Sequence, residues 1–389
     1  MEVPKGFSFN AVEVGIKYRG RPDLGLIVSE RPCFWGGVFT RNDVKAAPVI
    51  LGLDRLRNSS KIRAILVNSG CANACTGEVG LRDAEVLLTE LAKHLRLSPE
   101  EILPASTGVI GSRLPVEKIL AGLSDLVKGL SPDKAPLVAR AIMTTDTFPK
   151  MISRTIKISH REVTLLGIAK GAGMIAPQMA TMLAFILTDA GVPSPKLRPW
   201  LAESVEFSFN RITVDGDTST NDTVYLLANA LAGEISVREE GLFKEALFEI
   251  SRELAYLIVK DGEGATKTVK IRVEGARNEE EALNLARAVA DSPLVKTAFF
   301  GEDPNWGRIM VALGKLGLGI LPERINIFIN DIPLVKGGLA TDKEGLAQKE
   351  MTRSEFTVKI ELGMGTAEAE ILTCDLSQDY IKINAEYRT

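Results

Sequence analysis

Residues 174–187 form the longest apolar stretch of this 389-residue chain, and they limit its possible folds more than any other segment. The stretch is interrupted by Pro177, Gln178 and Thr181, and it is shorter than the roughly 20 apolar residues that a membrane-spanning helix needs. Residues 182–188 have the apolar, branched character of a buried strand. The segment therefore predicts a core strand of a globular protein, with Thr181 immediately before it.

The same segment supports a second interpretation, in which Thr181 is a nucleophile. A threonine hydroxyl reacts poorly until a base removes its proton. If the bond between Ala180 and Thr181 were cut, Thr181 would gain a free α-amine with a reference pKa of about 8, and this amine could act as the base. The segment alone leaves both interpretations open, because a buried strand can also contain one threonine.

Histidine is scarce, which bears on this choice. The chain has only His94, in a predicted amphipathic helix, and His160, in a predicted hairpin turn. A Ser-His-Asp or Cys-His hydrolase would need one of them as its base, although a surface role suits both. Their scarcity favours a nucleophile that carries its own base.

Composition excludes several classes of protein. The net charge is −3 and no basic tract is present, so we expect no nucleic-acid partner. The start of the chain lacks the layout of a signal peptide, so we expect a cytoplasmic protein that does not associate with membranes. Cys71 and Cys75 form a C-x-x-x-C pair without a nearby histidine, so we expect no metal and regard buried thiols as the default.

Apolar periodicity predicts helices and strands that alternate along the chain. We expect strands over 24–29, 62–67, 154–158, 163–168, 182–188, 269–274, 324–329, 356–362 and 367–372, and helices over 82–94, 116–127, 133–143, 196–210, 239–259 and 278–290. No linker or repeat is visible. We therefore predict a single compact α/β body, with sheets sandwiched between helical layers.

Several loops carry residues suited to chemistry, and each also has a structural interpretation. Residues 104–111 could aim backbone N–H groups at an oxyanion, or could simply join a strand to a helix. Residues 144–147 could be polar ligands or a helix cap. Lys170 could hold a carboxylate, and Glu263 an ammonium group. Residues 301–308 could border a site or form a structural turn. Residues 170–176 formally match a dinucleotide-binding loop, but Pro177 falls where its helix should run.

Together, these segments resemble one family. They are Ser-Thr-Gly at 106–108, Thr-Thr-Asp-Thr at 144–147, Lys-Gly-Ala-Gly-Met-Ile-Ala-Pro at 170–177, Met-Ala-Thr-Met-Leu at 179–183, Asp-Gly-Glu-Gly-Ala-Thr at 261–266, Gly-Glu-Asp-Pro-Asn-Trp-Gly-Arg at 301–308 and the terminal Ile-Asn-Ala-Glu-Tyr-Arg-Thr. In this order, they resemble the glutamate N-acetyltransferases of arginine biosynthesis, also called ornithine acetyltransferases. Cys71 is the one departure noticed, where many relatives would have Asn.

The resemblance implies a self-cleaving enzyme. The precursor would cut itself between Ala180 and Thr181, giving an α chain (1–180) and a β chain (181–389) that share one compact body. Thr181 would then take acetyl from N2-acetylornithine and pass it to glutamate, a ping-pong N-acyltransferase reaction. The implied fold is the α/β type of self-processing aminopeptidases, and the implied assembly is α2β2 or larger.

The resemblance also implies the roles of individual residues. Thr107 and Gly108 would form the oxyanion hole. The substrate site would be lined by Thr147, Lys170, Thr181, Glu263, Asn384 and Thr389. No cofactor is implied, although acetyl-CoA could serve as a second acetyl donor. Two alternatives remain open: a self-processing amidohydrolase or aminopeptidase that passes the acyl group to water, and a non-catalytic amino-acid-binding protein.

Overall fold

The computed structural model describes residues 1–176 and 182–386, which form two compact units. Of the described residues, unit 1 comprises 1–176, 182–210 and 217–258, and unit 2 comprises 211–216 and 259–386. The boundary near residue 258 carries no linker-like composition. Unit 1 contains residues from both sides of the predicted cleavage position, whereas the division into 1–180 and 181–389 chains stays a prediction.

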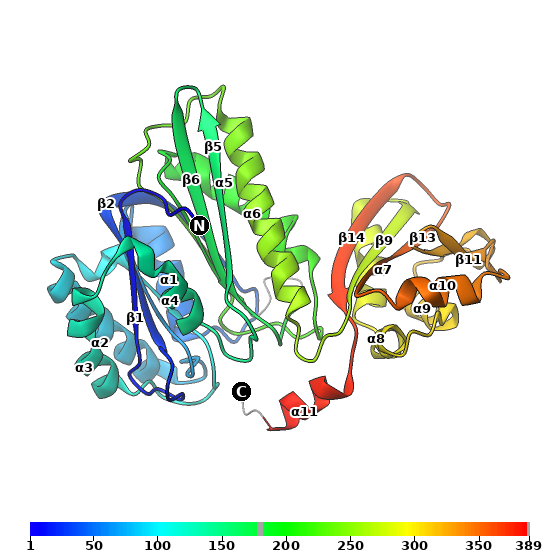
Figure 1. The fold of residues 1–389 in the computed structure, drawn as a ribbon, viewed down its shortest axis with the longest axis horizontal. Coiled ribbons are helices and arrows are strands. Elements are labelled where there is room, and N and C mark those ends of the chain that lie inside the picture. Colours follow the sequence, from blue (N-terminus) through cyan, green and yellow to red (C-terminus); the bar gives the residue numbers. More distant parts are fainter. Residues whose placement is uncertain (177–181, 387–389) are drawn as a thin grey trace. The chain divides into compact units, whose positions relative to one another are not determined.

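Unit 1 is built on a mixed eight-stranded sheet (Figure 1). Its described strands are β1 (Phe7–Val12), β2 (Leu24–Phe39), β3 (Ile62–Asn68), β4 (Ile102–Ser106), β5 (Lys150–Ile158), β6 (Arg161–Lys170), β7 (Leu183–Thr188) and β8 (Thr223–Ala228). Its helices are α1 (Ala47–Asn58), α2 (Gly77–Leu95), α3 (Val116–Lys128), α4 (Ala135–Ala141), α5 (Ser194–Glu206) and α6 (Glu240–Lys260). The main path of the sheet runs β4-β3-β2-β8-β7-β6-β5, and β1 pairs with β2.

The long strand β2 belongs to both halves of this sheet. Its first part pairs with β3 and its last part with β8, and the register shifts between Val28 and Cys33. One core cluster combines side chains of β3 and β4 with side chains of β6, β7 and β8. The Tyr225 hydroxyl on β8 also donates to the Pro104 carbonyl on β4 at 3.0 Å. The two halves therefore pack face to face.

Helices cover the outer faces of both halves. On β3, Ile65 and Val67 point into the core between the halves, whereas Ala64 and Leu66 pack with apolar residues of α2 and α3. This alternation follows from the two-residue period of a strand. On the other half, α5 packs on β2, and α6 lies so near β6 that a Cβ on Gly167 would come within 2.7 Å of Ile250. The predicted α/β class, with sheets between helical layers, is confirmed.

Unit 2 contains a six-stranded sheet in the order β12-β11-β10-β13-β9-β14. Its described strands are β9 (Thr268–Ala276), β10 (Asn326–Ile329), β11 (Ile332–Lys336), β12 (Leu339–Ala340), β13 (Glu355–Glu361) and β14 (Ala367–Cys374), and its helices are α7 (Glu279–Ala290), α8 (Pro293–Phe300), α9 (Trp306–Gly314), α10 (Glu344–Met351) and α11 (Gln378–Glu386).

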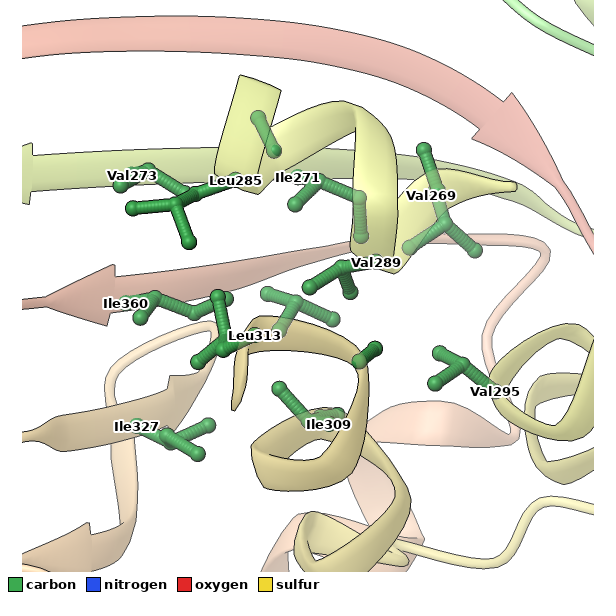
Figure 2. Close-up of a cluster of buried hydrophobic side chains, with 14 of the residues drawn as sticks. Val269, Ile271, Val273, Leu285, Val289, Val295, Ile309, Leu313, Ile327 and Ile360 are labelled. Carbon is green, nitrogen blue, oxygen red and sulfur yellow. The ribbon is translucent and has the colours of Figure 1, made fainter. Parts of the chain in front are cut away.

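Strand β9 shows how this sheet is covered. Val269, Ile271 and Val273 face a core shared with α7, α8 and α9 (Figure 2). The residues between them are charged, and Arg272 pairs with Glu274 and Glu368, both at 2.8 Å. The strand is thus apolar toward the helices and charged on the opposite face, as its alternating sequence dictates.

The predicted elements differ from the structure mainly at their ends. The helix expected over 133–143 is a short turn at Pro132–Lys134 followed by α4, and the helix expected over 196–210 spans Ser194–Glu206. Sequence analysis did not identify β1, α1, β4, β8, α8, α9, β11, β12, α10 or α11, and the loop expected over 104–111 begins inside β4. Within the described residues, no helix is sufficiently long and apolar to cross a bilayer.

Candidate active site

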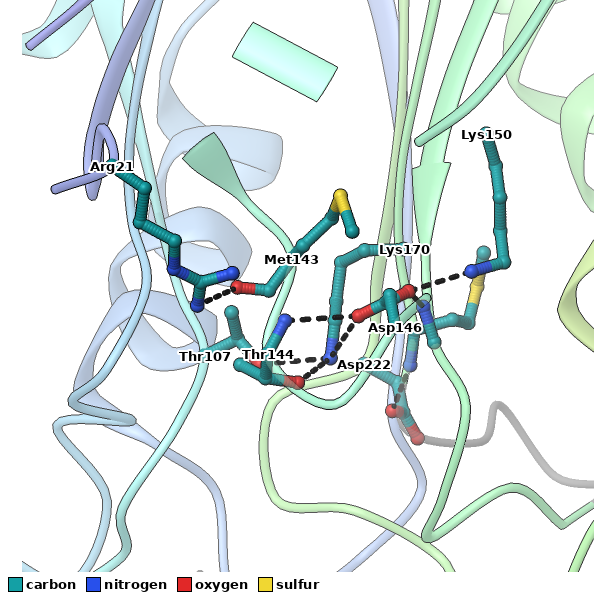
Figure 3. Close-up of polar contacts among 10 residues, drawn as sticks. Arg21, Thr107, Met143, Thr144, Asp146, Lys150, Lys170 and Asp222 are labelled. Carbon is teal, nitrogen blue, oxygen red and sulfur yellow. Dashed lines mark hydrogen bonds and ion pairs between the residues drawn. The ribbon is translucent and has the colours of Figure 1, made fainter. Parts of the chain in front are cut away.

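Lys170 is the last residue of β6 and the centre of a buried polar cluster in unit 1 (Figure 3). Its ammonium group donates to the Thr144 hydroxyl at 2.7 Å and to the Thr107 hydroxyl at 3.4 Å. Only 3% of Lys170 is exposed. Strand pairing places Lys170 opposite Leu183, two residues after Thr181 in the sequence. The cation therefore lies beside the start of β7.

Asp146 supplies the negative charge of this cluster. Its carboxylate accepts from Lys150 Nζ at 2.7 Å and lies 3.7 Å from Lys170 Nζ. Backbone N–H groups of Gly171 and Thr144 donate to it at 2.7 and 2.9 Å. Burial alone would raise the pKa of Asp146, but the two lysines and these hydrogen bonds outweigh it and hold the pKa below its usual range. Asp146 is therefore an anion that fixes the Lys170 ammonium group.

The loop after β4 brings Thr107 and Gly108 next to the cluster. Gly108 has φ +130°, and a Cβ there would lie 2.4 Å from the Gly70 carbonyl carbon, so only glycine fits. The Thr107 N–H donates to the Asn68 carbonyl at 3.0 Å, which leaves the Thr107 hydroxyl as its remaining donor. The Gly108 N–H donates to no backbone carbonyl within the described residues. These two groups could receive an oxyanion.

Asp222 lies just before β8 and is fully buried. One of its carboxyl oxygens accepts from the Met182 N–H at 3.0 Å, and the Thr223 N–H donates to the Met182 carbonyl at 3.1 Å. Burial raises the pKa of Asp222 well above its usual range, which favours the neutral acid. The backbone of Met182 is thus held by a buried carboxyl group on one side and by the Thr223 N–H on the other.

In unit 2, Glu263 and Asn384 are in contact. The Asn384 amide, on α11, donates to the Glu263 carboxylate at 2.7 Å. The Ser377 hydroxyl donates to the Gly264 carbonyl at 2.6 Å, and Gly264 has φ +68° where a Cβ would lie 2.5 Å from the Tyr380 nitrogen. The 261–266 loop is therefore fixed against the segment that leads into α11.

The 301–308 loop has structural partners. Asn305 caps α9 by accepting from the Arg308 N–H at 3.3 Å. Arg308 donates to the Leu294 carbonyl of α8 at 2.8 Å, and Glu302 pairs with Lys267 at 2.8 Å. These contacts agree with the structural interpretation of this loop.

The structure thus brings Thr107 and Lys170 together in unit 1, and Glu263 and Asn384 together in unit 2. Thr147 follows Asp146 directly and is exposed. The predicted residues Ala180, Thr181 and Thr389 lie outside the described residues. Sequence reasoning missed Asp146, Lys150, Asn221 and Asp222. Asp146 stands inside a quoted motif, but nothing in the local sequence marks the other three.

The cysteines differ in accessibility. Cys33, Cys71 and Cys374 are buried, whereas Cys75 is exposed. The default expectation of buried thiols is therefore wrong for Cys75, because the chain there turns through a left-handed residue, with φ +56°, ahead of α2. Within the described residues, no group of three or more His, Cys, Asp or Glu side chains is arranged to hold a metal ion.

Comparisons with known proteins all point to one family. The ArgJ family model matches residues 8–389. A relative from Desulfotalea psychrophila, named arginine biosynthesis bifunctional protein ArgJ, is 50% identical over 395 residues and covers 100% of both chains. A Geobacter sulfurreducens relative of the same name is 49% identical over 391 residues, with 99% of each chain covered. The crystal structure of the Bacillus halodurans protein of that name matches with a TM-score of 0.51 and 39% identity, covering 53% of this chain and 100% of that one.

Proposed function

Since the chain belongs to the ArgJ family, we propose that it transfers acetyl from N2-acetylornithine to glutamate in arginine biosynthesis. One observation carries this proposal. Lys170, which the resemblance assigns to the substrate site, contacts the hydroxyl of Thr107, which it assigns to the oxyanion hole. Strand pairing places Lys170 opposite Leu183, two residues after Thr181 in the chain.

The nucleophile arises by self-cleavage. The Thr181 hydroxyl oxygen attacks the Ala180 carbonyl carbon, the C–N bond breaks, and the Thr181 nitrogen leaves as an amine. Water then hydrolyses the ester, so that Ala180 ends as a carboxylate and Thr181 as a free N-terminus. The new amine is the base that the scarce histidines do not supply.

Acetyl transfer uses the same hydroxyl twice. The Thr181 oxygen attacks the acetyl carbonyl carbon of N2-acetylornithine, its proton passes to the Thr181 amine, and that amine protonates the departing ornithine nitrogen. The glutamate amine then attacks the acetyl ester, which releases N-acetylglutamate and restores the hydroxyl. The Thr107 hydroxyl accepts from Lys170, so its own proton is available to donate to both tetrahedral oxyanions alongside the Gly108 N–H.

Charge selects the substrate. A buried cation at Lys170 suits the α-carboxylate that ornithine and glutamate share. The Glu263 carboxylate, oriented by Asn384, suits the ammonium group of the ornithine side chain. Thr147 and the terminal Thr389 complete the site in this proposal. No cofactor is needed.

The word bifunctional in the relatives' names supports a second donor. We therefore extend the proposal to acetyl-CoA, which would acetylate the same Thr181 before glutamate attacks. The working assembly would be the α and β chains paired as α2β2 or larger, in the cytoplasm.

A denaturing gel, N-terminal sequencing and a transfer assay test this function together. We expect two bands, with the second chain beginning Thr-Met-Leu-Ala. We also expect ornithine release that depends on glutamate, parallel lines in double-reciprocal plots, and one acetyl group on the 181–389 chain when glutamate is withheld. Thr181→Ala should remain a single chain without transfer.

Thr188→Ala is the matched control, because it removes a buried threonine from the far end of β7, the strand that follows Thr181 in the sequence. It should still cleave and transfer. Acetate release without glutamate would favour the amidohydrolase. An uncut wild-type chain that binds ornithine without turnover would favour the binding protein. Cleavage and transfer by Thr181→Ala would place the nucleophile elsewhere.

A further inference from the structure

Asn221 and Asp222 are consecutive polar residues just before β8, and both are buried. Neither belongs to the residues that the family resemblance assigns to the site. Each makes hydrogen bonds to a different part of unit 1. Their partners are the two backbone segments between which the proposed acetyl transfer must take place.

Asp222 holds the nucleophile side. Its Oδ1 accepts from the Met182 N–H at 3.0 Å, and that nitrogen belongs to the peptide bond joining Thr181 to Met182. The backbone of Asp222 is itself fixed, because the Thr40 N–H donates to its carbonyl at 3.0 Å. Figure 3 shows the Asp222 carboxyl group below the Asp146 and Lys170 cluster.

Asn221 holds the oxyanion side. Its amide nitrogen donates to the Ser106 carbonyl at 2.8 Å and to the Ala72 carbonyl at 2.7 Å. The Ser106 carbonyl belongs to the peptide bond that leads into Thr107. The Ala72 N–H in turn donates to the Val109 carbonyl at 3.0 Å, which closes the loop around Gly108. The Asn221 side chain therefore holds the start of the 107–108 loop directly and its end through Ala72.

The amide of Asn221 is oriented by its own neighbours. The Thr220 hydroxyl donates to Asn221 Oδ1 at 2.6 Å, so the nitrogen must face the two carbonyls. The Asn221 N–H donates to the Ser219 hydroxyl at 3.0 Å, and the Thr223 hydroxyl donates to the Asn221 carbonyl at 2.9 Å. A segment tied at this many polar atoms is rigid, as a positioning element must be.

We propose that Asn221 and Asp222 are positioning residues that set the distance between the Thr181 nucleophile and the Thr107–Gly108 oxyanion loop. This inference rests on the proposed function. Neither side chain takes part in bond making. Because they are adjacent in the chain, any shift of one anchored segment moves the other with it. Displacement of a reacting group by about 1 Å can lower a rate on the order of 100-fold.

The test uses pairs of variants. Asp222→Ala removes the acceptor for the Met182 N–H, whereas Asp222→Asn keeps an oxygen in the same place. Asn221→Ala removes the donor to both carbonyls, and Asn221→Asp replaces it with an oxygen that repels them. We expect Asp222→Ala, Asn221→Ala and Asn221→Asp to slow self-cleavage and to lower kcat by roughly 10-fold to 100-fold. KM for N2-acetylornithine should stay within about twofold, because the substrate contacts are untouched.

Matched controls lie at the other ends of the same strands. Asp189 follows β7 and accepts from the Thr164 and Lys5 N–H groups at 2.9 and 3.1 Å, and Asn229 follows β8 and donates to the Lys5 carbonyl at 2.8 Å. Asp189→Ala and Asn229→Ala remove equally buried polar side chains far from the loop. Both variants should keep the wild-type kcat. Their Tm values should be compared with those of the Asn221 and Asp222 variants, so that a loss of stability is distinguished from a loss of activity.

The kcat values of these variants decide the inference. Recovery of at least tenfold in kcat by Asp222→Asn over Asp222→Ala supports it. Wild-type kcat in folded Asp222→Ala or Asn221→Ala overturns it, as does an equal loss in the two controls. If the alanine variants do not fold, Asn221→Ser is used instead, because its hydroxyl keeps one hydrogen-bond donor. A wild-type kcat in Asn221→Ser would also overturn the inference. Absence of transfer in the wild-type protein would instead overturn the proposed function.

Discussion

Asp146 faces two lysine ammonium groups, and its side chain and that of Lys150 have no exposed surface. A buried charge is tolerated only when it is paired and hydrogen-bonded, and Asp146 contacts Lys150, Lys170, Gly171 and Thr144. Removing one member of such a group leaves the others uncompensated. The carboxylate therefore links the stability of unit 1 to the charge presented by Lys170.

Asp146→Asn should lower the free energy of unfolding at pH 7 by about 3 to 5 kcal/mol, because two buried cations lose their anion. The folded-state pKa of Asp146 is lowered from the reference value of 3.8, so its contribution is complete above pH 3.8 and is lost as the pH falls toward the folded pKa. The gap between wild type and variant should therefore narrow below about pH 4. Urea titrations across this range measure it, and a gap that does not change with pH would contradict the assignment.

Thiol reactivity should follow burial. Burial raises the pKa of Cys33 to about 12 and also raises the pKa values of Cys71 and Cys374. In the native protein a thiol reagent should modify one cysteine, Cys75, and after unfolding it should modify all four. Cys75→Ser provides the control, since the native variant should not react. Rapid labelling of that variant would mean that a buried thiol opens to solvent.

At the scale of elements, the loop after β4 owes its shape to Gly108. Gly108→Ala combines a strained φ, costing about 1 to 3 kcal/mol, with an overlap on Gly70 that costs a further ~1 to 3 kcal/mol. Gly111 also has a positive φ of +81° but has open space around it, so Gly111→Ala carries only the first cost. We expect the larger loss of Tm in Gly108→Ala. Equal losses in the two variants would show that the close approach to Gly70 does not matter.

Elements with a clear apolar period or within a long apolar run, such as β7, were predictable, whereas several shorter apolar runs were missed. The helix 82–94 was predicted because Leu87, Leu88 and Leu91 recur on one face, and the structure extends it to Gly77–Leu95. Strand β8 is buried at every position, so it shows no alternation and resembles any short apolar run. Helix α1 has a Pro near its start and Gly52 inside, which obscured its apolar face.

The site divides in the same way. Lys170 and Thr107 were predicted because their motifs resemble a family, and the structure places them 3.4 Å apart. Sequence analysis did not predict Asn221 and Asp222. Their partners, at 72, 106 and 182, are remote in sequence and meet only after the sheet folds on itself. Local sequence carries no information about such contacts. For Asp146, the neighbouring threonines gave a signal, but only the fold supplies its two lysines.

At the scale of the whole molecule, the sheet of unit 1 is built from both sides of the predicted cleavage position. Strand β6 pairs with β7 from Leu165 opposite Thr188 to Lys170 opposite Leu183, and β2 pairs with β8 over six residues from Phe34 to Phe39. The central core cluster also combines Ile65 and Leu103 with Phe185 and Leu227. A cut at 180–181 would break one peptide bond and none of these contacts.

The two chains left by cleavage should therefore stay together without a covalent link. Strand pairing and a shared apolar core resist separation until unit 1 itself unfolds, because exposing that core to water is costly. We expect the 1–180 and 181–389 chains to elute as one species in size-exclusion chromatography, at low and at high salt, and to separate only in denaturant. The uncut Thr181→Ala protein should elute at the same volume. Separation of the chains in buffer without denaturant would mean that the sheet, which contains strands from both sides of the predicted cleavage position, does not persist after cleavage.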